Sequence, residues 1–344
     1  MDANHHHRFA LPDRSFASIT KRDIAKLAEG WGFSEGEIGK VNIVVSELLS
    51  NLAKFSANGG EILVKPIGNP IHTFEIVCMD NGPGMSEPAR MQEDGVSTFG
   101  SSGEGLGAIK RQSSFFDLYS QPNFGTVILV HITKASALSK ILQAPARLET
   151  GYIMVPKPNE TVCGDGFAIT VKNSRTEILA LDGLGHGTNA NEASGQAIAA
   201  FHENISLDPA NRLRAIHGAI KRTRGAVGFS ASISNGTITY CGIGNIAGKL
   251  YTPESSLLGA QYKNIISYNG ILGHNIPTTL NNQQLEWMRN KILILHSDGL
   301  KSRWDIGKYP NLLKHHPTTI AAVLYLDNSR HTDDTLVVVC KAKL

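Results

Sequence analysis

The hydrophobic pattern of the first part of the chain alternates between the period of a helix and that of a strand. Apolar residues recur every three or four positions over 34–55, which predicts a long amphipathic helix, and Ser34 and Glu37 form a capping box at its start. A shorter helix is predicted over 108–115, and strands are predicted at 61–67, 73–79, 117–120 and 126–133. Helices combined with hairpin-like strands favour an α+β sandwich in which the helices cover one face of the sheet.

A different pattern begins at about residue 151, where short apolar β runs surround three helical segments. The helices are predicted at 189–203, 209–223 and 317–326. The strands are predicted at 152–155, 166–171, 176–182, 228–234, 237–243, 246–251, 291–296 and 335–340. Many antiparallel strands with a few helices favour a layered α/β/β/α sandwich. We therefore predict two domains, 1–133 and 151–344, joined by a linker over 134–150 that contains Pro145 and has no strand pattern.

The amino-acid composition is typical of a globular protein. The chain has 344 residues, enough for two ordinary domains, and its 41% hydrophobic and 18% charged residues are typical of a globular protein rather than a disordered one. A formal net charge of +3, with Lys and Arg scattered, does not indicate a nucleic-acid or membrane surface. No apolar segment approaches the length of a membrane span, and the N-terminus lacks the apolar region of a signal peptide, so we expect a cytoplasmic protein.

The positions of the cysteines and of the N-terminal histidines do not favour a metal site. None of the four cysteines belongs to a CxxC pair and each lies in an apolar run, which predicts buried free thiols in a reducing compartment: Cys78, Cys163, Cys241 and Cys340. His5, His6 and His7 admit two interpretations, a metal site or part of a first strand or tag, and their isolated terminal position favours the second.

Two polar residues on the long helix and two glycine-rich segments form the first set of candidate site residues. Glu47 and Asn51 are four positions apart, so their side chains share one helix face, although a solvated polar edge would give the same pattern. The segment DNGPGM, with Asp80, directly follows the apolar strand FEIVCM, and the segment STFGSSGEGLGAIKR then opens a helix. The glycines of these two segments are Gly82, Gly84, Gly103, Gly105 and Gly107.

These residue types suit a bound nucleotide. A carboxylate at a strand end can accept a hydrogen bond from an adenine amino group, and glycines at a helix start let amide N–H groups approach phosphates. Asn51 would coordinate the Mg²⁺ that bridges the phosphates, and Glu47 would act as base for an incoming hydroxyl. Two other nucleotide motifs fail: GEGLGA follows a polar loop rather than a strand, against a Rossmann site, and no GxxxxGK[ST] occurs in the chain.

The ordered motifs E-x-x-x-N, D-x-G-x-G and G-x-G-x-G, followed by a Gly-Thr pair, resemble those of the histidine-kinase-like ATPase (GHKL) superfamily over about residues 5–133. ELLSNLAKFSANGGEI, DNGPGM and DGVST are most similar to its bacterial anti-sigma and stressosome switch serine kinases. The resemblance implies a Bergerat-type α/β sandwich that uses ATP and Mg²⁺, with Glu47 as catalytic base, Asn51 as Mg²⁺ ligand and Asp80 as adenine anchor. It also implies that the glycines shape the lid and phosphate loop and that Thr126 supports the adenine pocket. Since no phosphoacceptor-histidine helix precedes these motifs, we expect phosphorylation of Ser or Thr on a partner protein.

One residue departs from this pattern. Glu104 places a negative charge among the phosphate-facing glycines, where a like charge at about 5 Å and an effective dielectric of about 20 costs about 3 kcal/mol. Glu104 must therefore point to water, which we favour, or it weakens ATP binding.

The second set of candidate site residues consists of aspartates at the ends of apolar β runs. They occur in VCGDGF, LALDGLGHG, LILHSDGL and HTDDTLVVV, as Asp165, Asp182, Asp298, Asp333 and Asp334. Asp-Gly pairs are common in turns, which would explain any one of them alone. Asp165 and Asp182, however, bracket one predicted hairpin over 166–181, and glycine follows three of the four positions, which leaves space beside each carboxylate.

Four acids in one pocket require neutralising cations. Two carboxylates about 4 Å apart repel by about 4 kcal/mol at an effective dielectric of about 20. Oxygen ligands select Mg²⁺ or Mn²⁺, and two such ions with a bridging water provide a hydroxide nucleophile and bind the oxygens of a phosphate. The aspartates therefore predict a two-metal phosphate-ester hydrolase.

The segments CGDGF, DGLGHGTNANEAS, KRTRGAVGFSASI, ITYCGIGNI, LHSDGL and TDDTLVVV resemble the PPM (PP2C-like) metal-dependent Ser/Thr phosphatases, in the SpoIIE-type sporulation and stress-response branch, over about 151–341. The resemblance implies two Mn²⁺ or Mg²⁺ ions with the ligands Asp165, Asp182, Gly183, Asp298 and Asp334. Asp182 would bridge both ions, and Asp165 would bind or orient a bridging or metal-bound water. His186 is expected to face solvent on its loop, although a polar role near the phosphate is an alternative.

A kinase-like and a phosphatase-like domain in one chain predict a bifunctional switch. Relatives of both families act on Ser or Thr of small STAS-domain proteins, so we expect phosphorylation by 1–133 and dephosphorylation by 151–344 of such a partner. The alternative is a phosphatase whose first domain only senses ATP or binds a partner such as a sigma factor. Relatives of the first domain often dimerise, so a homodimer is a further option, and no nucleic-acid or membrane partner is expected.

Overall fold

The computed structural model describes residues 5–12, 14–56, 59–92, 105–138, 148–172, 174–252 and 261–342. Contacts between residues divide the chain into two compact units. The N-terminal unit consists of His6–Pro145 together with Lys314–Leu326, and the C-terminal unit contains Ala146–Leu313 and Asp327–Leu344. The segment 314–326 therefore packs with strands that precede it by about two hundred positions, whereas the predicted second domain ran continuously over 151–344.

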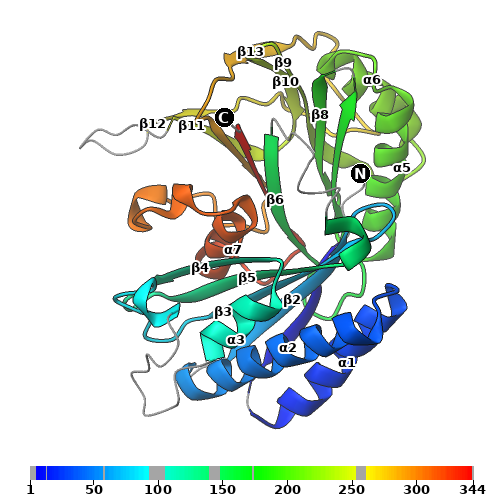
Figure 1. Cartoon of the computed structure of the whole chain (residues 1–344). Helices are drawn as coiled ribbons and strands as arrows, with labels where there is room; N and C mark the ends of the chain where they lie inside the picture. Colours follow the sequence, from blue (N-terminus) through cyan, green and yellow to red (C-terminus); the bar gives the residue numbers. More distant parts are fainter. Residues whose placement is uncertain are drawn as a thin grey trace. The chain divides into compact units, whose positions relative to one another are not determined.

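The N-terminal unit is built on one antiparallel five-stranded sheet with the order β1-β2-β3-β5-β4. Its strands are β1 (His7–Leu11), β2 (Gly60–Ile67), β3 (Thr73–Asp80), β4 (Phe115–Gln121) and β5 (Gly125–Thr133). Its helices α1 (Ala17–Gly30), α2 (Glu35–Phe55) and α3 (Gly105–Gln112) cover one face of this sheet (Figure 1). The core on that face joins α2 residues such as Val45 and Leu48 to alternate strand residues such as Ile62, Ile76 and Ile128.

The long helix agrees closely with its prediction. Ser34 caps α2, its hydroxyl accepts a hydrogen bond from the Glu37 backbone N–H, and the Glu37 carboxylate accepts one from the Ser34 N–H, which confirms the capping box. The helix predicted over 108–115 is α3, which begins and ends three residues earlier than predicted because β4 already starts at Phe115. The helix α1 was not predicted, since it buries only Thr20, Ile24 and Ala28 and its apolar stripe is short.

The C-terminal unit contains two antiparallel five-stranded sheets, of order β13-β10-β9-β8-β7 and β12-β11-β14-β15-β6. The first sheet consists of β7 (Asp165–Lys172), β8 (Arg175–Gly183), β9 (Ala226–Ser234), β10 (Thr237–Ile243) and β13 (Gln283–Glu286). The second consists of β6 (Leu148–Val155), β11 (Ala247–Thr252), β12 (Gln261–Asn264), β14 (Ile292–His296) and β15 (Thr335–Ala342). One apolar core includes residues of both sheets, such as Phe229 and Leu295, and thus forms a sandwich.

Two helices, α5 (Thr188–Glu203) and α6 (Pro209–Ala219), share a second core with the first sheet through residues such as Phe201 and Leu213. The mixed α/β class is therefore confirmed, and the strand pairs of this unit follow the predicted runs closely. The predicted third helix exists as α7 (Pro317–Asn328), but residues up to Leu326 pack with the N-terminal unit.

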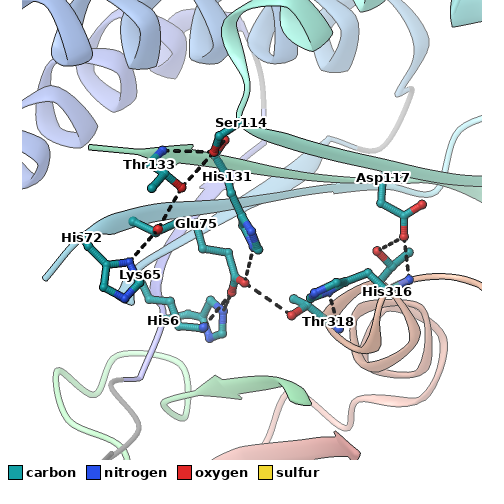
Figure 2. Close-up of polar contacts among 12 residues, drawn as sticks. His6, Lys65, His72, Glu75, Ser114, Asp117, His131, Thr133, His316 and Thr318 are labelled. Atoms are coloured by element: carbon teal, nitrogen blue, oxygen red, sulfur yellow. Dashed lines mark hydrogen bonds and ion pairs between the residues drawn. The ribbon is translucent and has the colours of Figure 1, made fainter. Parts of the chain in front are cut away.

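A polar network lies on the second face of the N-terminal sheet, where segment 314–326 packs (Figure 2). The buried Glu75 carboxylate forms an ion pair with Lys65 Nζ at 2.8 Å. It also accepts hydrogen bonds from a ring nitrogen of His131 at 2.9 Å and from Thr318 Oγ1 at 3.3 Å. His6, directly before β1, lies 3.4 Å from the same carboxylate, in line with a first strand. Burial alone would raise the pKa of Glu75, but Lys65 and the hydrogen bonds from His131 and His6 hold it well below its usual value.

Asp117 on β4 forms hydrogen bonds with the start of segment 314–326, and these should make the free energy of unfolding depend on pH in the acid range. Its carboxylate accepts hydrogen bonds from His315 Nδ1 at 2.9 Å, the His316 N–H at 2.9 Å and Thr319 Oγ1 at 2.7 Å. Burial opposes ionisation, yet these partners lower the pKa of Asp117 to about 2. Because the folded pKa is below the unfolded one, this stabilisation is present above about pH 4 and lost as the pH falls toward 2.

We expect Asp117→Asn to remove about 2 kcal/mol of this pH-dependent stability, from about 1.4 kcal/mol per pKa unit. The measurement is urea unfolding between pH 6 and pH 2 on both proteins, and the variant should show the shallower loss. Glu87→Gln, at an exposed ion pair with Arg90, is the matched control and should follow the parent curve. Parallel curves for Asp117→Asn and the parent would contradict the role of this carboxylate.

Two further expectations concern the chain as a whole. Cys78, Cys163, Cys241 and Cys340 are all free and buried, as predicted. Among the helices in the described ranges, none combines the length and apolar character needed to cross a membrane.

Candidate active sites

The strand pairing of the C-terminal unit brings the predicted acids to one end of its two sheets. Asp165 opens β7 and lies directly opposite Asp182 on β8 in the antiparallel register. Asp298 follows β14, and Asp334 precedes β15, which pairs with β14 in antiparallel fashion. The end of one strand therefore meets the start of the other in both pairs.

Electrostatic interactions show that these carboxylates are close together. Burial, then Asp182, raises the pKa of Asp165 well above its usual value. Burial, then Asp298, raises the pKa of Asp182 to about 7. Asp334 and Asp298 contribute to the rise at Asp165, so all four acids share one region. The structure thus brings together acids that are up to 169 positions apart in the sequence, from Asp165 to Asp334.

Neighbouring groups fix the orientation of each carboxylate. Ser297 Oγ donates to Asp165 Oδ2 at 2.7 Å, and Asn245 Nδ2 donates to Asp298 Oδ2 at 3.0 Å. Asp334 accepts hydrogen bonds from the backbone N–H groups of Lys157 at 2.8 Å and Gly164 at 3.0 Å. The backbone N–H of Asp298 donates to the Asp182 carboxylate. Sequence reasoning missed Ser297 and Asn245, although both lie in the segments LHSDGL and ITYCGIGNI that carried the resemblance.

Gly183 must be glycine for steric reasons. A Cβ at this position would lie 2.6 Å from the Ala190 carbonyl oxygen and 2.7 Å from that of Gly164. Its N–H also donates to the Gly164 carbonyl at 3.2 Å. The turn after Asp182 therefore packs closely against the start of α5 without side chains of its own.

His186 lies on the loop that follows this turn. Its Nδ1 is 2.7 Å from Glu160 Oε1, and its side chain is 45% exposed. Its charge also bears on Asp334, whose pKa is raised chiefly by burial and lowered in part by His186. His186 is thus both solvent-exposed and close to the acids, and Glu160 is a neighbour that the sequence did not suggest.

The acid cluster fits divalent cations. Its donors are oxygens, and burial together with mutual repulsion raises the pKa values of Asp165 and Asp182, which a nearby cation would reverse. Within the described ranges, however, no group of three or more His, Cys, Asp or Glu side chains is arranged so that it could hold a metal ion by itself. Water molecules and carbonyl oxygens would have to supply the remaining ligands, as they commonly do for Mg²⁺.

We expect Mn²⁺ to raise the unfolding temperature of the C-terminal unit. A ligand at a hundred times its dissociation constant stabilises the folded state by about 2.7 kcal/mol, or about 5–10 °C for a unit of this size. Differential scanning fluorimetry with and without MnCl₂ measures the shift. Asp182→Asn should raise the metal-free unfolding temperature, because repulsion is relieved, and should shrink the Mn²⁺ shift. An equal shift in both proteins would contradict binding at these acids.

In the N-terminal unit, Glu47 and Asn51 lie on one face of α2 beside the start of α3. A Cβ built on Gly105 would lie 3.0 Å from Glu47 Oε2 and 3.9 Å from Asn51 Oδ1. Two side-chain oxygens therefore face the bare first residue of a helix, whose N–H groups favour negative charge. Gly107 is buried in the same helix, whereas Gly103 and Glu104 lie outside the described residues.

Asp80 stands at the end of β3, close to the last turn of α2. Its Oδ1 accepts a hydrogen bond from the Gly82 N–H at 2.7 Å, and burial raises its pKa. A Cβ on Gly82 would lie 2.6 Å from the carbonyl oxygen of Phe55, one turn beyond Asn51. The loop that carries Asp80 is therefore held against the end of the helix that carries Asn51.

The same loop requires glycine at a second position. Gly84 has a φ of +69°, and a Cβ there would lie 1.9 Å from the Gln121 carbonyl oxygen. Thr126 is buried on β5 directly opposite Asp80, and its Oγ1 is 2.9 Å from Ser120 Oγ. These residues fit a nucleotide in kind: a buried carboxylate, a bare loop and oxygens beside a helix start.

Comparison with known proteins gives two relatives of different activity. The chain is 29% identical over 156 residues to the phosphoserine phosphatase RsbX of Bacillus subtilis (strain 168), which covers 44% of this chain and 75% of RsbX. It is 29% identical over 102 residues to the serine/threonine-protein kinase RsbT of the same organism, which covers 30% of this chain and 77% of RsbT. No protein-family model matches the chain.

Among solved structures, RsbX in complex with magnesium matches with a TM-score of 0.51 and 23% identity, over 58% of this chain and 98% of that one. At this identity the likeness establishes the fold. The chain therefore contains a PP2C-like α/β fold and has homologues that are a phosphatase and a kinase. The Bergerat-type fold of the N-terminal unit stays a prediction.

Proposed function

We propose that this chain is a bifunctional regulatory enzyme that dephosphorylates and phosphorylates Ser or Thr of a STAS-domain partner protein. The observation that carries the proposal is the gathering of Asp165, Asp182, Asp298 and Asp334, with the raised pKa values that their proximity produces. The pairing of a phosphatase and a kinase among its relatives supports two activities in one chain.

In the proposed phosphatase, this chain's residues hold two Mn²⁺ or Mg²⁺ ions and leave room for a phosphate. Asp182, Asp298, Asp334 and the Gly183 carbonyl would be ligands, and Asp165, fixed by its hydrogen bond from Ser297, would orient water. When bound, the ions lower the pKa of water and neutralise the phosphate oxygens. The missing side chain at Gly183 lets the turn after Asp182 pack closely against the Gly164 and Ala190 backbone, which fixes the position of the Asp182 carboxylate.

In the proposed kinase, Glu47 would accept the proton of the attacking hydroxyl, and Asn51 would bind the Mg²⁺ that accompanies ATP. Asp80 would accept a hydrogen bond from the adenine amino group, and Thr126, which lies opposite it on the neighbouring strand, would support the adenine pocket. The closeness of Gly105 to both Glu47 and Asn51 supports a phosphate position at the start of α3.

The relatives and the two proposed activities support the partner class. A kinase and a phosphatase on one chain can set the phosphorylation level of one protein, as partner-switching regulation requires. We propose a STAS-domain partner in the cytoplasm, in keeping with four free buried thiols. A homodimer through the N-terminal unit is a secondary proposal.

The test uses purified full-length chain and a STAS-domain protein, ideally one that co-purifies with it. With labelled ATP and Mg²⁺ the partner should gain phosphate on Ser or Thr, and with Mn²⁺ and no ATP it should lose that phosphate. Failure of release would refute the phosphatase.

The alternative is a phosphatase whose N-terminal unit senses ATP or binds a partner such as a sigma factor without transferring phosphate. Glu104, a negative charge among the expected phosphate-binding glycines, favours this alternative. Measuring ATP binding and ATP turnover side by side distinguishes the two: binding without turnover or partner phosphorylation supports the sensor.

A further inference from the structure

Arg224 lies at the same end of the strands as the acid cluster, but it is not among the proposed metal ligands. It lies in the loop between α6 and β9, two residues before the strand begins. On β9, Ala226 is opposite Gly183 and Val227 is opposite Asp182. The strand register therefore places the Arg224 backbone next to the turn that carries the central acid.

The guanidinium of Arg224 lies over that turn. A Cβ built on Gly185, which has a φ of +84°, would lie 2.8 Å from Arg224 Nη1. The Leu184 N–H also donates to the Gly225 carbonyl at 3.0 Å and joins the two loops. Any side chain at Gly185 would occupy the space that the guanidinium now fills.

The backbone around Arg224 is held firmly. His274 Nε2 is 2.8 Å from the Arg224 carbonyl oxygen, and the Gly225 N–H donates to Thr223 Oγ1 at 3.0 Å. A Cβ on Gly225 would lie 2.5 Å from the Leu272 carbonyl oxygen, so this position also excludes side chains. The base of the arginine is thus fixed, while its side chain is exposed.

The charge of Arg224 is not used within the described protein. Among the ion pairs between described residues, none involves its guanidinium, although the turn that it covers directly follows Asp182 of the acid cluster. Those carboxylates are held by backbone N–H groups, Ser297 and Asn245 instead. An exposed guanidinium on a fixed backbone, with no ion pair among the described residues, suits a phosphoryl dianion, which it can bind through two parallel hydrogen bonds.

We propose that Arg224 binds the phosphoryl group of the substrate at the C-terminal site, an inference that rests on the proposed phosphatase function. It would contribute to substrate binding and orientation, and not to metal binding. Since the contact is with the phosphoryl group itself, it would strengthen the binding of a small phosphate ester as well as that of a phosphoprotein.

The experiment compares Arg224→Ala with Arg222→Ala, a matched control because Arg222 is exposed in the same loop. The full Mn²⁺-loaded chain is assayed with para-nitrophenyl phosphate and with the phosphorylated STAS-domain protein. A lost charge-assisted contact should raise KM for both substrates by about 10- to 100-fold in Arg224→Ala, with a smaller change in kcat. Arg224→Lys should recover part of the loss, and Arg222→Ala should match the parent. Thermal unfolding verifies that the variants are folded.

The outcomes separate the inference from the proposed function. An unchanged KM for para-nitrophenyl phosphate overturns the inference, and a loss confined to the phosphoprotein would mean that Arg224 contacts the partner's surface instead. If the parent hydrolyses neither substrate, the phosphatase proposal fails. The role of Arg224 in phosphate binding is then tested separately, by calorimetric titration of the Mn²⁺-loaded chain with inorganic phosphate. Weaker binding in Arg224→Ala but not in Arg222→Ala supports the inference, whereas equal binding, or none in the parent, overturns it.

Discussion

Asp182→Ala is expected to reduce phosphate release from the phosphorylated partner by about 1000-fold or more, the loss typical of removing a central catalytic group. Asp182 lies opposite Asp165, accepts the Asp298 N–H, and has its pKa raised to about 7 by burial and by Asp298. Asp182 thus interacts with several members of the cluster. The measurement is single-turnover release of phosphate in the presence of Mn²⁺.

The same variant should keep its ability to phosphorylate the partner with ATP. Asp305→Asn is a suitable control, because Asp305 is an aspartate of the same unit outside the acid cluster that caps a short helix through the Gly307 N–H. It should release phosphate at the parent rate. Loss of both activities in Asp182→Ala would argue against two independent sites.

Glu47→Ala is expected to remove phosphate transfer from ATP by a similar factor while phosphate release continues. Glu47 Oε2 is the atom nearest to the Cβ position of Gly105, where the phosphates are expected. Alanine favours the helical conformation, so α2 should persist. Transfer of labelled phosphate to the partner is the measurement, and Glu35→Ala, at the exposed start of the same helix, is the control.

The result also decides between the two proposed roles of the N-terminal unit. A base that acts only in transfer should leave ATP affinity nearly unchanged when it is removed. If Glu47→Ala transfers phosphate as fast as the parent, Glu47 is not the base. If neither protein transfers phosphate but both bind ATP, the sensor alternative is favoured.

Local periodicity explains why much of the fold could be predicted. The stripe over 34–55 contains enough apolar residues to specify α2, and its cap residues mark the start. The predicted hairpin over 166–181 places Asp165 opposite Asp182, because strand register follows from the alternation of buried residues. Both features depend on residues that are close in sequence.

Other features left little local signal. The strands β12 and β13 are exposed or half-exposed, so no alternation of apolar residues marks them. Ser297 and Asn245 are ordinary loop residues until the fold brings them to Asp165 and Asp298. The location of segment 314–326 depends on contacts with residues such as Asp117, which sequence periodicity cannot reveal.

The position of segment 314–326 has a consequence for dividing the chain into separate fragments. Residues 314–326 lie between Asp298 and Asp334 in the chain, yet their packing partners include Glu75 and Asp117. If the chain were cut at residue 150, the second fragment would carry this helix without its sheet, and the first would expose buried charges to water. Each fragment would therefore lack packing that it has in the whole chain, and we expect both to be less stable when they are produced separately.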